Sequence, residues 1–278
     1  MRDLSRDTRF LSINTATLRR ERPLAEVVSA LARAGIPGIG PWREQIQAIG
    51  IKAAVKLIGD HGLAVSGISR AGVFTAKGRA GLQDVLDDNR RAVDEAAGIG
   101  ARCLVLIGGG LMPGSRDIAD ARALFAEGLA ALLPHARAAH LPLAIEPLHP
   151  MYAADRACIN TLAQANDLCD ALGEGVGVVV DVYHTWWDPG LEHEIARAGA
   201  RRILAFHLSD WLVPTTDLLL DRGMMGDGVI DLKRIRGWVE AAGFEGMCEV
   251  EIFSQRDWWQ RSMEEVLRTS VERYKSVC

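Results

Sequence analysis

The sequence predicts one domain of the (β/α)8 barrel class over residues 1–278. Eight short apolar runs alternate with amphipathic stretches, at about 35 residues for each pair in this chain of 278. Strands that alternate with helices imply a parallel sheet with right-handed crossovers, and eight units of this size favour a closed barrel. The main alternative, a doubly wound open sheet, normally has a glycine-rich turn after its first strand, whereas this chain continues with NTATLRR.

The order of elements follows from periodicity and from glycines. Each predicted strand is a short apolar run, and the helices show apolar residues at helical spacing, as in Leu232, Ile235 and Val239. Glycines of the kind that end helices precede several strands: Gly35, Gly62, Gly100, Gly173 and Gly243. The predicted strands are 9–13, 36–40, 64–68, 102–107, 142–146, 176–181, 203–208 and 247–252. The predicted helices are 23–35, 43–60, 80–99, 117–140, 160–172, 190–200, 231–242 and 257–276.

The composition is that of an ordinary globular protein. Apolar residues make up 49% and charged residues 24% of the chain, and the net charge of −4 gives no basic surface for nucleic acid. No apolar run approaches the roughly 20 residues of a membrane span, and the first ten residues lack the apolar core of a signal peptide. Five cysteines without a pairing or metal-binding spacing favour a reducing compartment, so we expect a cytoplasmic location.

Four successive predicted strands each end on a side chain that could bind a metal ion. Because the carboxyl ends of all strands open on one face of a parallel barrel, these side chains would surround a single point. Three carboxylates and one imidazole suit Mn²⁺, Mg²⁺ or Co²⁺ in six-coordination, with Zn²⁺ as a further option. The runs are LPLAIE with Glu146, VGVVVD with Asp181, ILAFH with His207 and MCEVE with Glu251.

The last of these strands offers two glutamates. Glu249 and Glu251 are two residues apart and face the same way, so the sequence allows either as the ligand. Glu251 lies nearer the end of the strand and is the one that we predict. Glu249 would then lie one layer deeper in the barrel, next to a basic group.

Other polar and aromatic residues follow the same strands. His184 comes three residues after Asp181, in DVYHTWWD, and could reach the substrate or the metal. Arg222, in DRGMMGDGVID, could hold a hydroxyl, phosphate or carboxylate. Among the tryptophans that follow strands, Trp187 is the one predicted to line the substrate site. The connection 211–229 is the longest in the chain and is a candidate lid.

The chain resembles the xylose isomerase-like TIM barrels, the sugar phosphate isomerase/epimerase superfamily that includes ketose 3-epimerases, inosose dehydratases and endonuclease IV. The resemblance covers nearly the whole chain. It is carried by the segments IEPL, VDVYH, FHLSD, DRGMMGDGVID and EVEIF.

The resemblance implies a role for each residue of these segments that matches the ketose epimerases. Glu146, Asp181, His207 and Glu251 would hold one divalent metal ion, and His184 and Arg222 would touch a sugar. The two glutamates would also be the catalytic base and acid, transferring a proton through a cis-enediolate. The implied activity is the isomerisation or epimerisation of a sugar or sugar phosphate.

Three other functions remain open at this stage. A dehydratase of the inosose type would expel a hydroxyl group instead of returning the proton. An endonuclease IV-like enzyme would need three zinc ions and additional histidines, where this chain has Arg70, the glycines at 108–110 and Gly223. A barrel that binds a sugar without chemistry is the alternative from another class.

The resemblance also bears on the partners that we expect. The segment WLVPTTDLLL lengthens the connection between FHLSD and DRG relative to the epimerase pattern, which suggests a different substrate. We expect a small carbohydrate as the partner, with neither nucleic acid nor membrane. The sequence does not fix the oligomeric state, for which a dimer or a tetramer is compatible.

Overall fold

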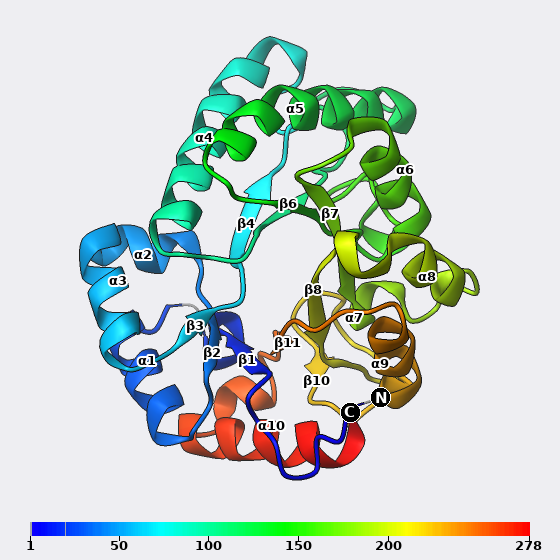
Figure 1. Ribbon diagram of the computed structural model, residues 1–278. Helices are drawn as coiled ribbons and strands as arrows, with labels where there is room; N and C mark the ends of the chain where they lie inside the picture. The colour runs from blue at the N-terminus through cyan, green and yellow to red at the C-terminus, as the bar shows by residue number, and fades with distance from the viewer. Residues whose placement is uncertain (1, 20) are drawn as a thin grey trace.

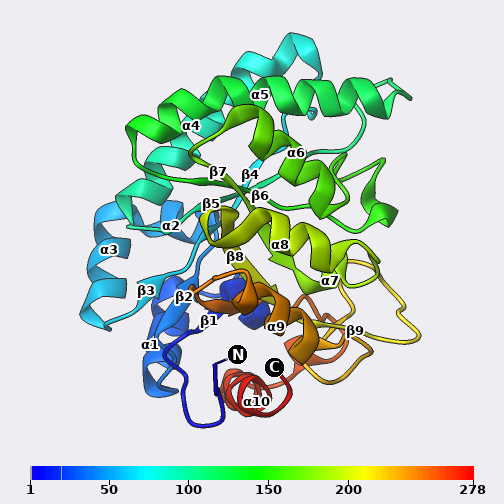
Figure 2. The ribbon, with the colours of Figure 1, turned by 45° about the vertical axis from the view of Figure 1, so that its right-hand side comes forward.

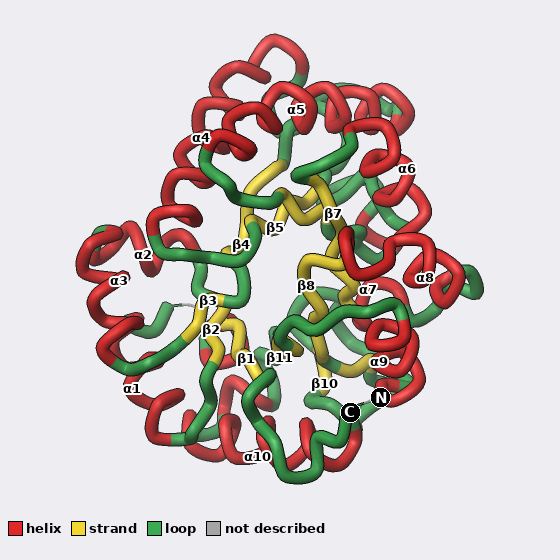
Figure 3. The backbone as a smooth tube through the Cα atoms, in the orientation of Figure 1, coloured by secondary structure: helices red, strands yellow, loops and turns green. Residues whose placement is uncertain are grey.

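The fold was analysed in a computed structural model, which describes residues 2–19 and 21–278. A ring of parallel strands encloses the centre of the molecule, and the long helices lie outside it (Figures 1 and 3). The two ends of the sequence lie side by side, because β1 (Leu11–Asn14) pairs with β11 (Cys248–Val250) and helix α1 (Leu24–Arg33) contacts helix α10 (Met263–Val277). The predicted barrel is therefore confirmed.

Nine strands form the ring in the order β3-β2-β1-β11-β8-β7-β6-β5-β4, and every pairing within it is parallel. A separate antiparallel ribbon of β9 (Asp210–Trp211) and β10 (Arg222–Gly223) follows β8. The strands of the ring are β1 (Leu11–Asn14), β2 (Gly38–Gly40), β3 (Ala64–Val65), β4 (Ile68–Gly72), β5 (Leu104–Ile107), β6 (Leu143–Ile145), β7 (Val176–Asp181), β8 (Ile203–Leu208) and β11 (Cys248–Val250).

The third predicted strand, 64–68, is in fact two strands. β3 pairs with β2, and β4 pairs with β5, so one continuous stretch of chain changes neighbours and nearly closes the ring. An isolated bridge between Trp42 and Ser69 also links the end of β2 to β4. Strand irregularity of this kind was not visible in the apolar pattern.

The helices lie close to their predicted positions, with one break. The predicted helix 43–60 is two helices, because Gly50 adopts a φ of 80° between them. The last predicted helix begins later, at Met263, after the short turn η4 (Trp258–Gln260). The long helices are α1 (Leu24–Arg33), α2 (Arg43–Ile49), α3 (Ile51–Asp60), α4 (Leu82–Gly98), α5 (Ile118–Ala138), α6 (Leu162–Leu172), α8 (Leu191–Arg202), α9 (Leu232–Ala241) and α10 (Met263–Val277).

Side-chain capping defines where several helices begin. Asp117 accepts hydrogen bonds from the backbone of Ala119 and Asp120 at the start of α5. Thr161 and Gln164 form a capping box at the start of α6. All five glycines predicted to end helices have positive φ angles, between 67° and 91°, as a left-handed C-terminal residue requires.

Residues along a strand alternate in direction, so the strands contribute to different parts of the core. The large cluster packs between the strands and the helices and includes Ile145, Val180 and Phe206. A small cluster of Cys103, Val105, Ala144, Val179 and Ala205 forms separately. Three of its members precede Glu146, Asp181 and His207 by two residues, so the small cluster lies in the lumen, directly beneath these polar side chains.

In both views helix α5 lies at the top of the molecule and helix α10 at the bottom, on opposite sides of the ring of strands (Figure 2). Among the residues that the structure describes, no helix is both long enough and apolar enough to cross a bilayer.

Candidate metal centre

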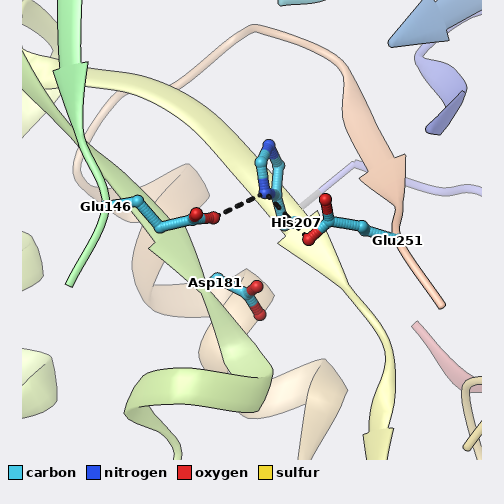
Figure 4. Close-up of side chains that lie close together, drawn as sticks. All are labelled: Glu146, Asp181, His207 and Glu251. Atoms are coloured by element: carbon cyan, nitrogen blue, oxygen red, sulfur yellow. Dashed lines mark hydrogen bonds and ion pairs between the residues drawn. The ribbon is translucent and has the colours of Figure 1, made fainter. Parts of the chain in front are cut away.

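Four buried side chains converge at the carboxyl ends of β6, β7, β8 and β11. Glu146, Asp181, His207 and Glu251 each offer a ligand atom, and these atoms all lie within 4.8 Å of one another. The register places Asp181 directly beside His207 on the neighbouring strand. Figure 4 shows Glu146 and Glu251 reaching toward His207 from opposite sides, with Asp181 below. The structure therefore brings together the four residues predicted to bind a metal.

The electrostatics of this cluster reflect its burial. His207 Nδ1 is 3.1 Å from Glu146 Oε1 and 3.9 Å from Glu251 Oε2. Burial opposes a charge on His207, but the carboxylates of Glu249 and Glu146 outweigh it and raise its pKa to about 10. Burial raises the pKa of the Asp181 and Glu251 carboxyl groups, although Arg222 opposes that shift.

The donor set fits a divalent cation. Buried carboxylates need a compensating charge, and among the described residues Arg222 is the single arginine or lysine within ion-pair distance of these three. Three carboxylates and one imidazole, with room for non-protein ligands, match the preferences of Mn²⁺, Mg²⁺, Co²⁺ and Zn²⁺.

Glu249 lies in the layer beneath, on the other side of the His207 ring. Its Oε1 is 3.8 Å from His207 Nε2 and accepts a hydrogen bond from Asn14 Nδ2 at 2.8 Å, and its Oε2 accepts one from Ser66 Oγ at 2.5 Å. A ring nitrogen that faces a carboxylate behind the site is the arrangement that orients histidine ligands of metals. The structure thus places Glu251 in the cluster and Glu249 in the layer below it, as the sequence predicted.

The predicted substrate residues His184 and Arg222 lie beside the cluster. Arg222 is 4% exposed, and its Nη1 is 3.1 Å from Glu251 Oε2 and 3.3 Å from Asp181 Oδ2. Its Nη2 is 3.0 Å from His184 Nε2, and the backbone N–H of His149 donates to His184 Nδ1. Burial, and then the charge of Arg222, lowers the pKa of His184 well below its usual value.

The turn that follows Arg222 is held by a residue that sequence reasoning missed. Asp210 is fully buried and accepts hydrogen bonds from the backbone N–H groups of Gly226, Gly228 and Ile230, at 2.9 to 3.0 Å. Gly223 of β10 pairs with Asp210 of β9, and the neighbouring Arg222 pairs with Trp211. The sequence did contain a sign of this residue, since Asp210 is the last residue of the FHLSD segment.

The cluster opens into a pocket that encloses about 430 Å³, its open mouth included. The pocket is lined by metal-centre residues, by arginines and by aromatic and aliphatic side chains that the sequence did not single out. These lining residues are Trp42, Ser69, Arg70, Ile107, Glu146, Leu148, Tyr152, Arg156, His184, Leu219, Arg222, Glu251 and Phe253.

The structure does not bring Trp187 to this pocket. Its indole N–H donates to the backbone carbonyl of His184, and its ring meets His149 edge-on at 5.8 Å. It lies on a separate depression with Trp238 and Val229. Trp42, by contrast, lines the metal pocket and donates from its indole to Asn14.

The candidate lid, 211–229, reaches the pocket through Leu219. Its middle part is held by its own turns, because Asp217 accepts from the backbone of Leu219 and Leu220 and Asp221 accepts from Thr216. The hydroxyl of Tyr183 also donates to the carbonyl of Leu218 at 2.9 Å. The lengthened segment therefore forms part of the pocket wall.

The chain belongs to the xylose isomerase-like TIM barrel family, whose family model matches residues 28–272. The crystal structure of protein SMc04130 from Sinorhizobium meliloti 1021 is similar over 98% of this chain and 99% of that one, with 58% identity and a TM-score of 0.95. A comparison with curated protein sequences finds no match.

More distant structures share the fold. A structure of IOLI protein with a bound zinc atom has 18% identity and a TM-score of 0.82, covering 96% of this chain and 97% of that one. A D-psicose 3-epimerase structure with D-fructose has 15% identity and a TM-score of 0.77, covering 95% and 96%. At these identities the likeness establishes the barrel architecture alone.

Proposed function

We propose that this protein is a divalent-metal-dependent isomerase or epimerase of a sugar or sugar phosphate. The observation that carries the proposal is the pair of buried carboxylates, Glu146 and Glu251, that approach a shared point from opposite sides. Zinc in the IOLI structure and the epimerase activity in the names of similar structures support it. A bound divalent ion would polarise the substrate carbonyl and the neighbouring hydroxyl as a Lewis acid.

The chain's own residues account for the proton transfers. One of Glu146 and Glu251 removes the proton from the carbon between carbonyl and hydroxyl, which gives a cis-enediolate of the substrate. The other carboxyl group, on the opposite side, can return a proton to the other face, and the product is then the epimer. Return of the proton to the neighbouring carbon gives the aldose–ketose isomer. His184 and Arg222 hold substrate oxygens beside the reacting carbons.

Solvent exchange tests this proposal. Metal-loaded protein is incubated with a panel of ketoses and their phosphates in deuterated water, and deuterium at the carbon next to the carbonyl is measured by NMR. We expect incorporation with the wild type and a loss of at least about a thousandfold, near 4 kcal/mol in the barrier, for Glu146→Gln and Glu251→Gln. Glu245→Gln, at an exposed position on the same chain segment, is the matched control.

Further measurements on the same proteins separate the alternative functions. A dehydratase would show loss of water in the product mass. A nuclease would cleave abasic duplex DNA and carry about three zinc ions per chain by metal analysis. Retained exchange in either glutamine variant would contradict the assigned acid–base roles, and sugar binding without exchange in any protein would favour a binding barrel.

A further inference from the structure

Two lines of ring contacts lead outward from Arg222, and each ends in another arginine. On one wall Arg222 lies over Phe253 at 5.1 Å, Phe253 meets Trp42 at 5.9 Å, and the guanidinium of Arg70 lies 5.9 Å from the Trp42 ring. All four residues line the metal pocket.

The other wall runs through His184 and Tyr152. His184 Nε2 is 3.0 Å from Arg222, its ring meets Tyr152 edge-on at 6.0 Å, and the Arg156 guanidinium lies 5.4 Å from the Tyr152 ring. Exposure rises along both walls, from buried Arg222 to half-buried Arg156 and exposed Arg70. The two outer arginines therefore stand at the mouth of the pocket, away from the metal centre.

Hydrogen-bond donors in this pocket lack partners. The Tyr152 hydroxyl, Arg156 Nε and Arg222 Nε are buried and have no hydrogen-bond partner within the described residues. Buried polar atoms nearly always have a hydrogen-bond partner, so buried donors without one require an explanation. Both arginine nitrogens can only donate. Three unpaired donors around one pocket predict a ligand rich in acceptor oxygens.

The charged side chains that line the pocket also favour a ligand with acceptor oxygens and negative charge. Of the described residues that line it, only Glu146 and Glu251 are acidic, and both belong to the metal centre. No described carboxylate lies within ion-pair distance of Arg156, although most other arginines of the chain have such a partner. The mouth is thus locally cationic in a chain whose net charge is −4.

We propose that the substrate carries an anionic group, a carboxylate or a phosphate ester, and that Arg156 and Tyr152 bind it at the mouth of the pocket. Arg70 supplies a second guanidinium from the opposite wall. The reacting carbonyl then lies at the other end, between Glu146 and Glu251. This inference rests on the proposed function for the position of the reacting end, and it names the class of substrate.

Binding to three matched ketoses tests the inference. Fructose, fructose 6-phosphate and fructuronate differ in one group, which is neutral, a phosphate ester or a carboxylate. Their dissociation constants are measured by calorimetry on the metal-loaded protein. We expect one or both anionic ketoses to bind at least about tenfold more tightly than fructose, as a hydrogen bond to a charged group would give. The stronger of the two identifies phosphate or carboxylate as the favoured group.

Two variants assign the effect to its residues. Arg156→Gln should abolish the preference for the anionic ketose, and Tyr152→Phe should reduce it severalfold, both with unchanged metal content and melting temperature. Arg116→Gln is the control, because it removes the same charge from an exposed arginine outside the pocket. Equal affinities for all three ketoses, or an unchanged preference in Arg156→Gln, would overturn the inference.

The outcome is independent of the test of the proposed function. Deuterium exchange that depends on Glu146, without any preference for anionic ketoses, would support the proposed enzyme activity and refute the anion subsite. Anion binding that depends on Arg156, without deuterium exchange, would support the anion subsite and refute the proposed isomerase activity.

Discussion

Replacing Glu249 by glutamine should weaken metal binding while leaving the fold nearly intact. The Glu249 carboxylate accepts from Asn14 and Ser66 and faces His207 Nε2 at 3.8 Å. A glutamine can keep its oxygen toward Asn14, whose amide can only donate at that atom, and turn its amide toward Ser66, whose hydroxyl can also accept. The packing and both hydrogen bonds are then retained, and what disappears is the negative charge behind His207.

The magnitude follows from that geometry. A carboxylate behind a histidine ligand fixes which ring nitrogen carries the proton and makes the other a better donor to the metal. Its loss typically costs about 10–100-fold in metal affinity, equivalent to about 1.4–2.7 kcal/mol. The loss of stability of the metal-free protein should be at most about 1–3 kcal/mol, because both hydrogen bonds are kept and only the second N–H of the new glutamine amide lacks an acceptor.

Calorimetric titration of metal-free protein with Mn²⁺ or Zn²⁺ measures this effect, together with urea unfolding. Glu245→Gln, which removes an exposed carboxylate four residues earlier, should bind the metal as the wild type does. An unchanged affinity in Glu249→Gln would refute the orienting role. Complete loss of binding in Glu249→Gln, with binding retained in Glu251→Gln, would show that Glu249 is itself the ligand.

Three further outcomes are expected. Gly40→Ala would place a methyl carbon 2.3 Å from Glu249 Oε1 and should cost about 1–3 kcal/mol in urea unfolding, whereas Gly59→Ala, with open space around it, should cost nothing. Asp210→Asn removes a buried acceptor of several backbone N–H groups and should lower the free energy of unfolding by about 1.5–3 kcal/mol. A metal ion at about 100 times its dissociation constant should raise the free energy of unfolding by about 2.7 kcal/mol. No thermal shift with any of the four metals would contradict a metal site in the folded state.

The apolar pattern was sufficient for the barrel and for the four converging side chains. Glu146, Asp181, His207 and Glu251 could be found because each ends a buried run, and a parallel barrel brings all such ends together. Strand parity alone left Glu249 and Glu251 equivalent. The structure separates them by depth, since Glu249 hydrogen-bonds to Asn14 and Ser66 in the layer below.

The pocket walls could not be predicted because their residues come from loops without periodicity. Tyr152 belongs to the short turn η3 (Pro150–Tyr152), and Arg156 follows it in an irregular segment. Trp187 is next to Trp186 after β7, and the sequence has no feature that tells which tryptophan faces the pocket. The break at Gly50 was missed for a related reason, since the apolar spacing continues on both sides of it.

The lengthened segment 211–220 forms a turn at Asp217, is linked to Asp221 through Thr216, and contributes Leu219 to the pocket. Two hydrogen bonds tie it to the segments that follow β7 and β11, because Tyr183 donates to the carbonyl of Leu218 and the backbone N–H of Gln255 donates to the carbonyl of Leu220. Related barrels could exchange this insert and acquire a different preference for the shape of the substrate, while the candidate acid–base pair Glu146 and Glu251 beneath it stays unaltered. For protein engineering, these few residues are the natural place to diversify.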